Sequence, residues 1–341
     1  MNSTQIASLK ALLDTPQKIV IVPHKGPDGD AIGSTTGLYG YLKNAGHDAT
    51  IIAPNDFPQF LKWMDFTEDI LIYDKNVDAA NNIIKDAQLI FILDHNSFKR
   101  AGDMETVLAA SDATFVMIDH HEQPDDFATY TYSDTGMSST CQMVYHFLEM
   151  LEQKDHITPQ IATALYTGIV TDTGNFKYRS CTSTTLRVAA SLVDAGANGE
   201  QINRNLFDAN NLSRLKLLAV ALSNLVVLPQ YRTAYITISQ QELDDNGFQK
   251  GDTEGFVNYA LSLENVVFAQ IFIENKDEGI LKTSLRSKGT FDVNLMAREH
   301  WNGGGHKNAA GGRSDDNIVD TIKKLISILP LYENDLNATA I

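Results

Sequence analysis

Four short apolar runs near the start of the chain constrain its fold more than any other feature. They are KIVIVP (18–23), ATIIAP (49–54), QLIFIL (88–93) and TFVMI (114–118), and each is continuous rather than alternating. Continuous apolar runs of this length are typical of strands buried on both faces, as in a parallel sheet. Helical patterns lie between them, for example GSTTGLYGYLKNAG at 33–46. The alternation predicts an α/β domain with a doubly wound, mainly parallel sheet.

The length of 341 residues indicates about two domains. Helical patterns continue from 138 to 193, and a polar stretch rich in Gly and Asn follows at 194–211. Beyond it we expect a helix at 212–227, strands at 233–238, 266–274 and 280–286, and helices at 254–263, 292–300 and 318–328. The sequence therefore predicts a first domain over 1–193, a connector over 194–211, and a smaller α/β domain over 212–341.

Composition argues against several classes of protein. The net charge is −16 and no block of Lys and Arg is present, which disfavours long duplex nucleic acid as a partner. No apolar run approaches the roughly 20 residues that span a bilayer, and residues 1–18 resemble an amphipathic helix rather than a signal peptide. Cys141 and Cys181 predict neither a disulfide framework nor a thiolate zinc site. We expect a cytoplasmic protein without a membrane partner; its oligomeric state, a homodimer included, is left open.

Acidic and imidazole side chains follow three of the four predicted strands. They are His24, Asp28 and Asp30 after the first run, Asp94 after the third, and Asp119, His120 and His121 after the fourth. In an open parallel sheet, ligands bind beyond the carboxyl ends of the strands, so these side chains should converge. Asp172, at the end of a helical pattern, is a further candidate. Each residue alone is more simply a turn or capping residue, but together they predict a site.

The composition of this cluster predicts bound divalent metal. Several carboxylates in one pocket raise each other's pKa unless a cation lies among them. Oxygen and imidazole ligands without thiolate favour Mn²⁺, and less strongly Fe²⁺ or Co²⁺, over structural zinc. Because the candidate ligands are too many for one ion, we expect two ions about 3.5–4 Å apart.

A second group of candidate residues lies near the C-terminus, in LRSKGTFDVN (285–294) and WNGGGHKNAAGGRS (301–314). The glycines before His306, including Gly304 and Gly305, would let backbone N–H groups approach an anion. Arg286 ends an apolar run and suits a bidentate contact to phosphate. Taken alone, this pattern is as well explained by a flexible Gly-rich loop. Beside a metal site, it predicts a phosphate clamp.

These motifs, in this order, resemble the DHH phosphoesterase family with its DHH-associated C-terminal domain. HKGPDGDAIGS is similar to the first family motif, Asp94 in ILDHNS to the second, DHH at 119–121 to the third, and Asp172 in TGIVTDTGNF to the fourth. GGGHKNAAGG with LRSKG resembles the C-terminal domain. The resemblance covers nearly the whole chain, and the two-domain length is similar to the branch of bacterial nano-RNases and 3′-phosphoadenosine-5′-phosphate phosphatases.

The resemblance implies roles for individual residues. His24, Asp28 and Asp94 would hold one Mn²⁺, and Asp30, Asp94, His120 and Asp172 would hold the other. Asp119 would orient a ligand histidine, and His121 would face the substrate. Arg286, Gly304, Gly305 and His306 would bind the terminal phosphate or nucleotide, with the active site in the cleft between the domains. The role of His95, directly after Asp94, stays open.

The predicted activity is metal-assisted hydrolysis of a phosphoester, in which hydroxide attacks phosphorus and His121 and Arg286 assist. The expected substrates are short single-stranded oligoribonucleotides, linear dinucleotides included, and 3′-phosphoadenosine 5′-phosphate. Phe176 and Tyr178 either stack a base or pack in the core. An inorganic pyrophosphatase or exopolyphosphatase is the alternative, although such sites need more Lys and Arg. A non-catalytic nucleotide sensor is less favoured, because no candidate ligand is missing.

Overall fold

The computed structural model describes residues 1–208 and 210–340, and the chain divides into two compact units, Met1–Ala209 and Asn210–Ile341. Most of the predicted connector is helical: α8 spans Gly199–Asn203 and a π-helical turn spans Arg204–Asp208. Both belong to the first unit, which therefore extends well beyond the predicted boundary at 193. Residue 209 of the predicted connector and residue 341 of the predicted second domain lie outside the described residues.

The first unit contains a six-stranded sheet in the order β3-β2-β1-β4-β5-β6, and all five strand pairings are parallel. Its strands are β1 Lys18–Val22, β2 Asp48–Ala53, β3 Leu71–Ile72, β4 Leu89–Leu93, β5 Thr114–Asp119 and β6 Tyr130–Ser133. The four predicted strands are confirmed as β1, β2, β4 and β5. The sequence analysis missed β3 and β6, because one is only two residues long and the other, YTYS, is half-exposed and has no apolar run.

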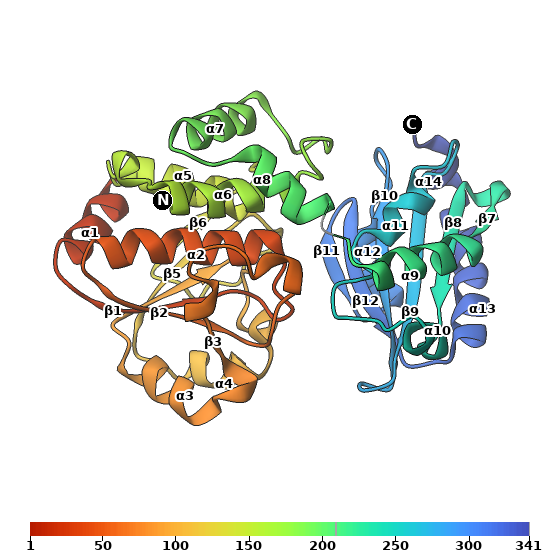
Figure 1. The fold of residues 1–341 in the computed structure, drawn as a ribbon, viewed down its shortest axis with the longest axis horizontal. Coiled ribbons are helices and arrows are strands. Elements are labelled where there is room, and N and C mark those ends of the chain that lie inside the picture. The colour runs from red at the N-terminus through yellow and green to blue at the C-terminus, as the bar shows by residue number, and fades with distance from the viewer. Residues whose placement is uncertain (209, 341) are drawn as a thin grey trace. The chain divides into compact units, whose positions relative to one another are not determined.

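Helices cover both faces of this sheet (Figure 1). On one face lie α2 Gly29–Asn44, α5 Thr140–Met150 and α6 Pro159–Asp172, and on the other lie α3 Val77–Asp86 and α4 Glu105–Ala109. Along β1, Ile19 and Ile21 belong to the first core, whereas Val20 and Val22 belong to the second. Burial on both faces explains why the strand sequence is continuously apolar. The predicted doubly wound α/β class is confirmed. Three further helices complete the unit: α1 Ser3–Leu13, α7 Ser183–Asp194 and α8.

The second unit has a six-stranded mixed sheet in the order β11-β12-β10-β9-β8-β7, in which only β8 and β9 pair in parallel. Its strands are β7 Val226–Leu228, β8 Thr233–Ile238, β9 Phe268–Asn275, β10 Ile280–Ser287, β11 Gly304–His306 and β12 Ala309–Ser314. Its helices are α9 Leu212–Ser223, α10 Gln240–Asp245, α11 Phe256–Leu261, α12 Val293–His300, α13 Ile318–Ile328 and α14 Glu333–Ala338. Apolar side chains from β9 enter a core on each face of the sheet.

One expectation for the second unit is wrong, and the alternative weighed for its Gly-rich stretch is excluded. The helix predicted over 212–227 ends at Ser223, and the Val226–Val227 pair starts β7, as expected for β-branched residues on a sheet edge. The Gly-rich stretch at 301–314 is not a flexible loop, because it forms the β11–β12 hairpin. Within the described ranges, no helix is both long enough and apolar enough to cross a bilayer.

Candidate active site

The carboxyl ends of β1, β4 and β5 bring the predicted residues of the first unit together. Asp94 follows β4 directly, Asp119 is the last residue of β5, and His24 comes two residues after β1. The sheet order changes direction between β1 and β4, which is where open α/β sheets bind ligands. His24, Asp94, Asp119 and His120 are all buried there. Their clustering agrees with the expectation from the strand ends.

Close packing of α2 against α6 adds the remaining carboxylates. A Cβ on Gly33 of α2 would lie 2.5 Å from the Ala164 carbonyl oxygen of α6, and one on Gly168 of α6 would lie 2.9 Å from Asp30 Oδ1 of α2 and 2.1 Å from Cys141 Sγ of α5. Only glycine permits these approaches, which set the start of α2 beside the end of α6. The start of α2 carries Asp28, as its N-cap, and Asp30; the last residue of α6 is Asp172. The glycines thus deliver side chains from both helices to one site.

Asp94 lies at the centre of the cluster. Its Oδ2 is 3.4 Å from His24 Nε2, whereas its Oδ1 is 3.6 Å from His120 Nε2 and accepts a hydrogen bond from Thr140 Oγ1 at 2.9 Å. The residue has a positive φ of 62°, which is uncommon for a non-glycine and is typical of residues held for function. The two oxygens of one carboxylate therefore face two different histidines.

Two groups made only of predicted ligands could each hold a metal ion, and a further possible group joins Asp94 to Asp119 and His121. One group is His24, Asp28 and Asp94, and the other is Asp30, His120 and Asp172; within each, one ligand atom per residue lies within 4.8 Å of the others. In the second group, His120 Nε2 is 3.7 Å from Asp30 Oδ2 and 3.6 Å from Asp172 Oδ2. The predicted ligands of the first unit are thus brought together.

The orientation of the two histidines fits metal binding. His24 Nδ1 donates to the Lys25 carbonyl at 3.0 Å, and His120 Nδ1 lies 3.3 Å from the Met137 carbonyl. These contacts leave Nε2 of each ring turned toward carboxylates, which is the usual arrangement of a metal-ligating histidine. The donor set of carboxylates and imidazoles suits Mn²⁺ and related divalent ions.

Electrostatics in the cluster favours a cation as well. Burial raises the pKa of Asp30 well above its usual value, and the charges of Asp94 and Asp172 raise it further. The Asp30 carboxylate is nevertheless held by the Thr140 and Cys141 backbone N–H groups, at 2.6 and 2.8 Å, at the start of α5. Burial lowers the pKa of His120, but the charges of Asp172 and Asp94 outweigh that effect, so its pKa is raised. A bound divalent ion would relieve the carboxylate repulsion directly.

Asp119 contacts a different histidine from the one implied by the family resemblance. Its Oδ1 lies 2.7 Å from His121 Nδ1, and its Oδ2 accepts the His121 backbone N–H at 2.9 Å. The resemblance assigned Asp119 to a ligand histidine, whereas its partner here is the residue expected to face the substrate. Burial lowers the pKa of His121 well below its usual value. The ring is therefore neutral, with Nδ1 protonated toward Asp119.

His95, whose role the sequence left open, is completely buried. Its Nδ1 donates to the Ser97 carbonyl at 3.0 Å, and burial lowers its pKa to about 3. It therefore stays neutral, and it belongs to none of the ligand groups found among the described residues. His95 is best described as a neutral histidine beneath the site.

Sequence analysis missed Thr140, which contacts two of the three carboxylates around His120. Its hydroxyl donates to Asp94 and its backbone N–H to Asp30. The indication in the sequence was Ser139, which is the N-cap of α5 and turns the first N–H groups of that helix toward the site. A helix N-terminus is well suited to hold a carboxylate.

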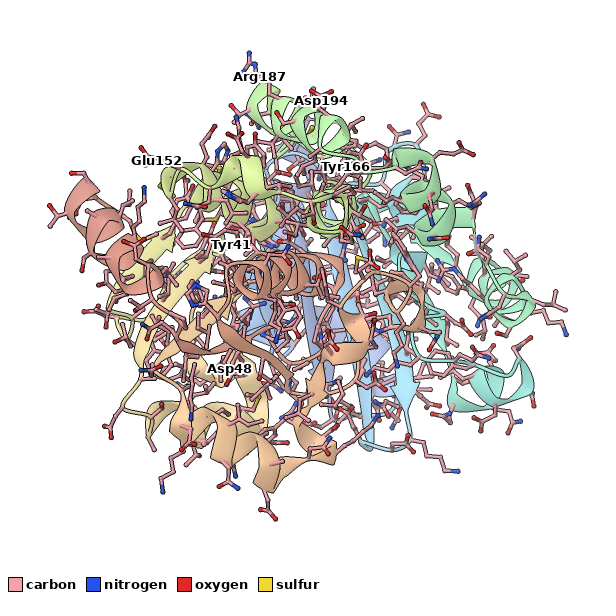
Figure 2. All side chains as sticks on the ribbon, turned by 60° about the vertical axis from the view of Figure 1, so that its left-hand side comes forward. Tyr41, Asp48, Glu152, Tyr166, Arg187 and Asp194 are labelled. Atoms are coloured by element: carbon pink, nitrogen blue, oxygen red, sulfur yellow. The ribbon has the colours of Figure 1, made fainter. Side chains whose placement is uncertain are left out.

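Phe176 and Tyr178, the two aromatic residues after Asp172, lie in different environments. Phe176 packs against the first core and lies edge-on to Tyr166, with ring centroids 6.0 Å apart; Figure 2 labels Tyr166 on α6. Tyr178 is 41% exposed and its ring covers Gly174. Core packing therefore accounts for Phe176, and only Tyr178 keeps an exposed ring.

In the second unit, Arg286 and His306 flank the same residue. Ala309 on β12 pairs with Arg286 on β10 and with His306 on β11. Directly opposed residues in antiparallel strands share a face, so both side chains project from one side of the sheet with the small Ala309 between them. Arg286 Nη1 donates to the Leu285 carbonyl at 2.9 Å, which orients the guanidinium.

Gly304 and Gly305 have a different local role from the predicted one. Both belong to β11, and the Gly305 N–H already donates to Asn294 Oδ1 at 3.0 Å. Gly305 has a φ of +151°, and a Cβ there would lie 2.5 Å from the Ala309 carbonyl oxygen. These glycines let the hairpin close tightly. The sequence analysis expected the Gly305 N–H to approach an anion, but it is already bound to Asn294.

Comparison with known proteins gives the same order of domains. Residues 18–169 match the model of the DHH family, N-terminal domain, and residues 230–329 match the DHHA1 domain. The bifunctional oligoribonuclease and PAP phosphatase NrnA of Thermus thermophilus is 30% identical over 86% of this chain and 83% of its own length. The protein of the same name from Bacillus subtilis is 27% identical over 90% of this chain and 92% of its own. These relatives are hydrolases by name, in agreement with the predicted enzyme class.

Solved structures agree. The crystal structure of an exopolyphosphatase-related protein from Bacteroides fragilis is 38% identical, covers 98% of both chains and superposes with a TM-score of 0.94. RecJ in complex with Mn²⁺ from Thermus thermophilus is 13% identical, with a TM-score of 0.52 over 98% of this chain and 54% of its own, and shows a likeness of fold alone. With both domain models matched in order and a relative at 30% identity over most of its length, the chain belongs to the DHH family.

Proposed function

We propose that this protein is a metal-dependent phosphoesterase that hydrolyses short oligoribonucleotides, linear dinucleotides included, and 3′-phosphoadenosine 5′-phosphate. The observation that carries the proposal is the position of Asp94 between two ligand groups, with Oδ2 3.4 Å from His24 Nε2 and Oδ1 3.6 Å from His120 Nε2. The substrate class is supported by the relatives named oligoribonuclease and PAP phosphatase. A cytoplasmic location remains part of the proposal.

Two Mn²⁺ ions suit the ligand groups. We assign one to His24, Asp28 and Asp94, and the other to Asp30, Asp94, His120 and Asp172. When bound, divalent ions in such a site lower the pKa of the attacking water and place positive charge beside the phosphate. The protein supplies the fixed carboxylates, and backbone carbonyls hold both imidazoles in the ligating tautomer.

His121 and Asp119 form the proton-handling pair of the proposed mechanism. Asp119 accepts from Nδ1 and so leaves Nε2 of His121 for the substrate. Nε2 of the neutral ring can take up a proton released by the attacking water, and the adjacent Asp119 carboxylate would stabilise the resulting imidazolium. We propose that this proton moves to the leaving oxygen of the substrate as the phosphoester bond breaks.

Arg286 and His306 are proposed to bind the terminal phosphate or nucleotide. Their shared position across Ala309 offers a guanidinium and an imidazole on one face of the sheet. Gly304 and Gly305 support this surface by allowing the hairpin to close, rather than by donating the Gly305 N–H.

An inorganic pyrophosphatase or exopolyphosphatase is the second candidate. The observation in its favour is the similarity to the exopolyphosphatase-related protein from Bacteroides fragilis. A compact polyanion requires several cations, and in the second unit Lys288 is partly committed to the Leu263 carbonyl. We therefore place this activity second.

The deciding experiment is a substrate panel. The purified protein is incubated with Mn²⁺ and, separately, dinucleotides, longer single strands, 3′-phosphoadenosine 5′-phosphate, pyrophosphate and polyphosphate, and the products are identified over time. We expect the dinucleotides and 3′-phosphoadenosine 5′-phosphate to react fastest. Faster turnover of pyrophosphate or polyphosphate would reverse the order of the two candidates. Binding of Mn²⁺ and dinucleotide without product would instead indicate a nucleotide sensor.

A further inference from the structure

Arg100, in the 3₁₀ helix Phe98–Met104 that follows β4, lies beside Lys25, the residue after His24, and has no role in the sequence motifs. We propose that Arg100 binds a non-bridging oxygen of the substrate phosphate beside the ligand group of His24. This inference rests on the proposed phosphoesterase function. It gives the first unit a phosphate contact of its own, in addition to Arg286 and His306 of the second.

Backbone hydrogen bonds fix Arg100 beside a candidate ligand. The Lys25 N–H donates to the Arg100 carbonyl at 2.7 Å, and Lys25 directly follows His24. The Arg100 N–H donates to the Ser97 carbonyl at 3.0 Å, which closes the turn after Asp94. The aliphatic part of Lys25 also lies across Gly102, where a Cβ would come 2.5 Å from Lys25 Cδ. The loops after β1 and β4 are thus held together at Arg100.

The Arg100 side chain is half-buried and unpaired within residues 1–208 and 210–340, where it makes neither an ion pair nor a hydrogen bond. Partial burial without a partner is costly for a guanidinium, which carries five donors in a planar fork. The same fork matches two oxygens of a phosphate. A phosphate bound at the site would supply the hydrogen-bond partners that the Arg100 guanidinium lacks.

The charge of the Arg100 guanidinium affects the pKa values of several residues of the site. Burial lowers the pKa of His121 and of His95, and the Arg100 guanidinium is the next largest cause of lowering for each. It also lowers the pKa of Asp119, which burial raises, and that of His24, which burial lowers and the Asp94 and Asp28 carboxylates raise. These effects agree with the position of Arg100 beside Lys25, the residue after His24.

The location suits charge that develops during hydrolysis. While His121 delivers a proton to the leaving oxygen, a guanidinium on a non-bridging oxygen would balance negative charge on the phosphoryl group as the bond breaks. Arginine is suited to this task, because it stays protonated at any working pH. Lysine would offer a single point charge in place of the fork.

The test compares Arg100→Gln with Lys99→Gln, an equal loss of charge at the exposed neighbouring residue. With Mn²⁺ and a dinucleotide, we expect Arg100→Gln to lower kcat/KM by roughly 10–100-fold, the range of one hydrogen bond to a charged group, and Lys99→Gln to resemble the wild type. Guanidinium ion added to Arg100→Ala should restore part of the lost rate, which a purely structural role would not allow. Equal activity of Arg100→Gln and Lys99→Gln would overturn the inference.

Two further measurements separate this inference from the proposed function. Bound Mn²⁺ should be the same in the wild type and Arg100→Gln; loss of metal would mean that Arg100 acts through the ligands and would refute phosphate contact. Titration of the Mn²⁺-loaded protein with AMP should show weaker binding to Arg100→Gln than to Lys99→Gln. That result is independent of turnover, so an inactive wild type would contradict the proposed function while the AMP titration still decides the role of Arg100.

Discussion

His121 Nδ1 lies 2.7 Å from Asp119 Oδ1, and the backbone N–H of the same histidine donates to Asp119 Oδ2 at 2.9 Å. One carboxylate therefore fixes both the ring and the main chain of His121. Asp119 itself is completely buried at the end of β5, so the pair is attached to an interior strand of the sheet. This is the position expected for a residue that sets the tautomer of a proton donor rather than one that binds metal.

Asp119→Asn should lower kcat by about 10–100-fold, the usual effect of losing such a supporting hydrogen bond. The amide can no longer stabilise a positively charged His121, although the side chain keeps its shape. The measurement is kcat as a function of pH, together with bound Mn²⁺. We expect the metal content to be unchanged, because His24 and His120 are held by backbone carbonyls instead. A loss of Mn²⁺ parallel to the loss of rate would show that Asp119 supports the metal.

His120→Ala and Asp172→Ala should each abolish turnover while the protein remains folded. Both residues belong to the same ligand group, in which their atoms lie 3.6 Å apart. Removing either leaves three of the four ligands that we assign to that ion, so one of the two proposed ions should be lost. Metal analysis and circular dichroism would check these outcomes, and near-wild-type turnover with saturating Mn²⁺ would rule out the two-metal assignment.

Removal of metal should destabilise the protein more at pH 8 than at pH 6. Burial, with the charges of Asp94 and Asp172, raises the folded-state pKa of Asp30, so the metal-free protein gains stability as pH falls through that raised pKa. The raised pKa of His120 acts in the same direction, since its protonated form pairs with Asp172 and Asp94. Above these pKa values the carboxylates repel one another and only a cation relieves them.

The measurement is the Tm of the protein with Mn²⁺ and with a chelator at each pH. The difference between the two Tm values should grow with pH, because metal binding competes with protons for these ligands. A difference that shrinks with rising pH would contradict the assignment of Asp30 and His120 as ligands. Asp30→Asn provides the control, because it should reduce the pH dependence of the metal-free protein.

The apolar runs that mark buried strands, together with the polar residues that follow them, predicted the site correctly. β1, β4 and β5 were visible as continuous apolar runs, and the parallel sheet then placed His24, Asp94 and Asp119 at one edge. β3 and β6 were missed because they are short edge strands, one of two residues and the other without an apolar run. Local patterns describe buried elements well and edge elements poorly.

Contacts between distant residues could not be inferred from the sequence. No local pattern places the Thr140 hydroxyl on Asp94, 46 positions away, or joins Lys25 to Arg100. The histidine that pairs with Asp119 could not be inferred from the sequence either, because His120 and His121 are adjacent. Only the backbone geometry after β5 selects His121. The Gly-rich C-terminal motif was misjudged for a similar reason: glycine permits both a loop and a tight hairpin, and pairing with Ala309–Ser314 decides between them.

Gly168→Ala should impair the site by separating the helices that build it. The new Cβ would lie 2.1 Å from Cys141 Sγ and 2.9 Å from Asp30 Oδ1, so α6 must move or the carboxylate must shift. We expect a loss of roughly 1–3 kcal/mol in unfolding free energy, the usual range for overpacking, and weaker Mn²⁺ binding. Gly199→Ala is the matched control, because its Cβ would come no closer than 3.4 Å to Tyr166. Equal stability and Mn²⁺ affinity of the two variants would show that close α2–α6 packing is not required.

Arg286→Gln should weaken substrate binding without affecting the metal. The guanidinium belongs to the second unit, and it is oriented by the Leu285 and Ala310 carbonyls at 2.9 and 3.4 Å. Loss of one charged hydrogen bond to the terminal phosphate should raise KM by about 10–100-fold, with bound Mn²⁺ unchanged. Arg313→Gln is the control, since Arg313 is an exposed arginine of the same sheet, on β12.

Replacing Ala309 distinguishes this explanation from a general loss of charge. Ala309 separates Arg286 from His306, so Ala309→Leu should crowd both side chains and raise KM although no charge is removed. Kinetics with a dinucleotide that carries a 5′-phosphate and one that lacks it would locate the effect. If Arg286 binds the terminal phosphate, both variants should lose most of the preference for the phosphorylated dinucleotide, whereas Arg313→Gln should keep it. An equal loss of preference in all three variants would mean that the face carrying Arg286 and His306 does not recognise the phosphate specifically.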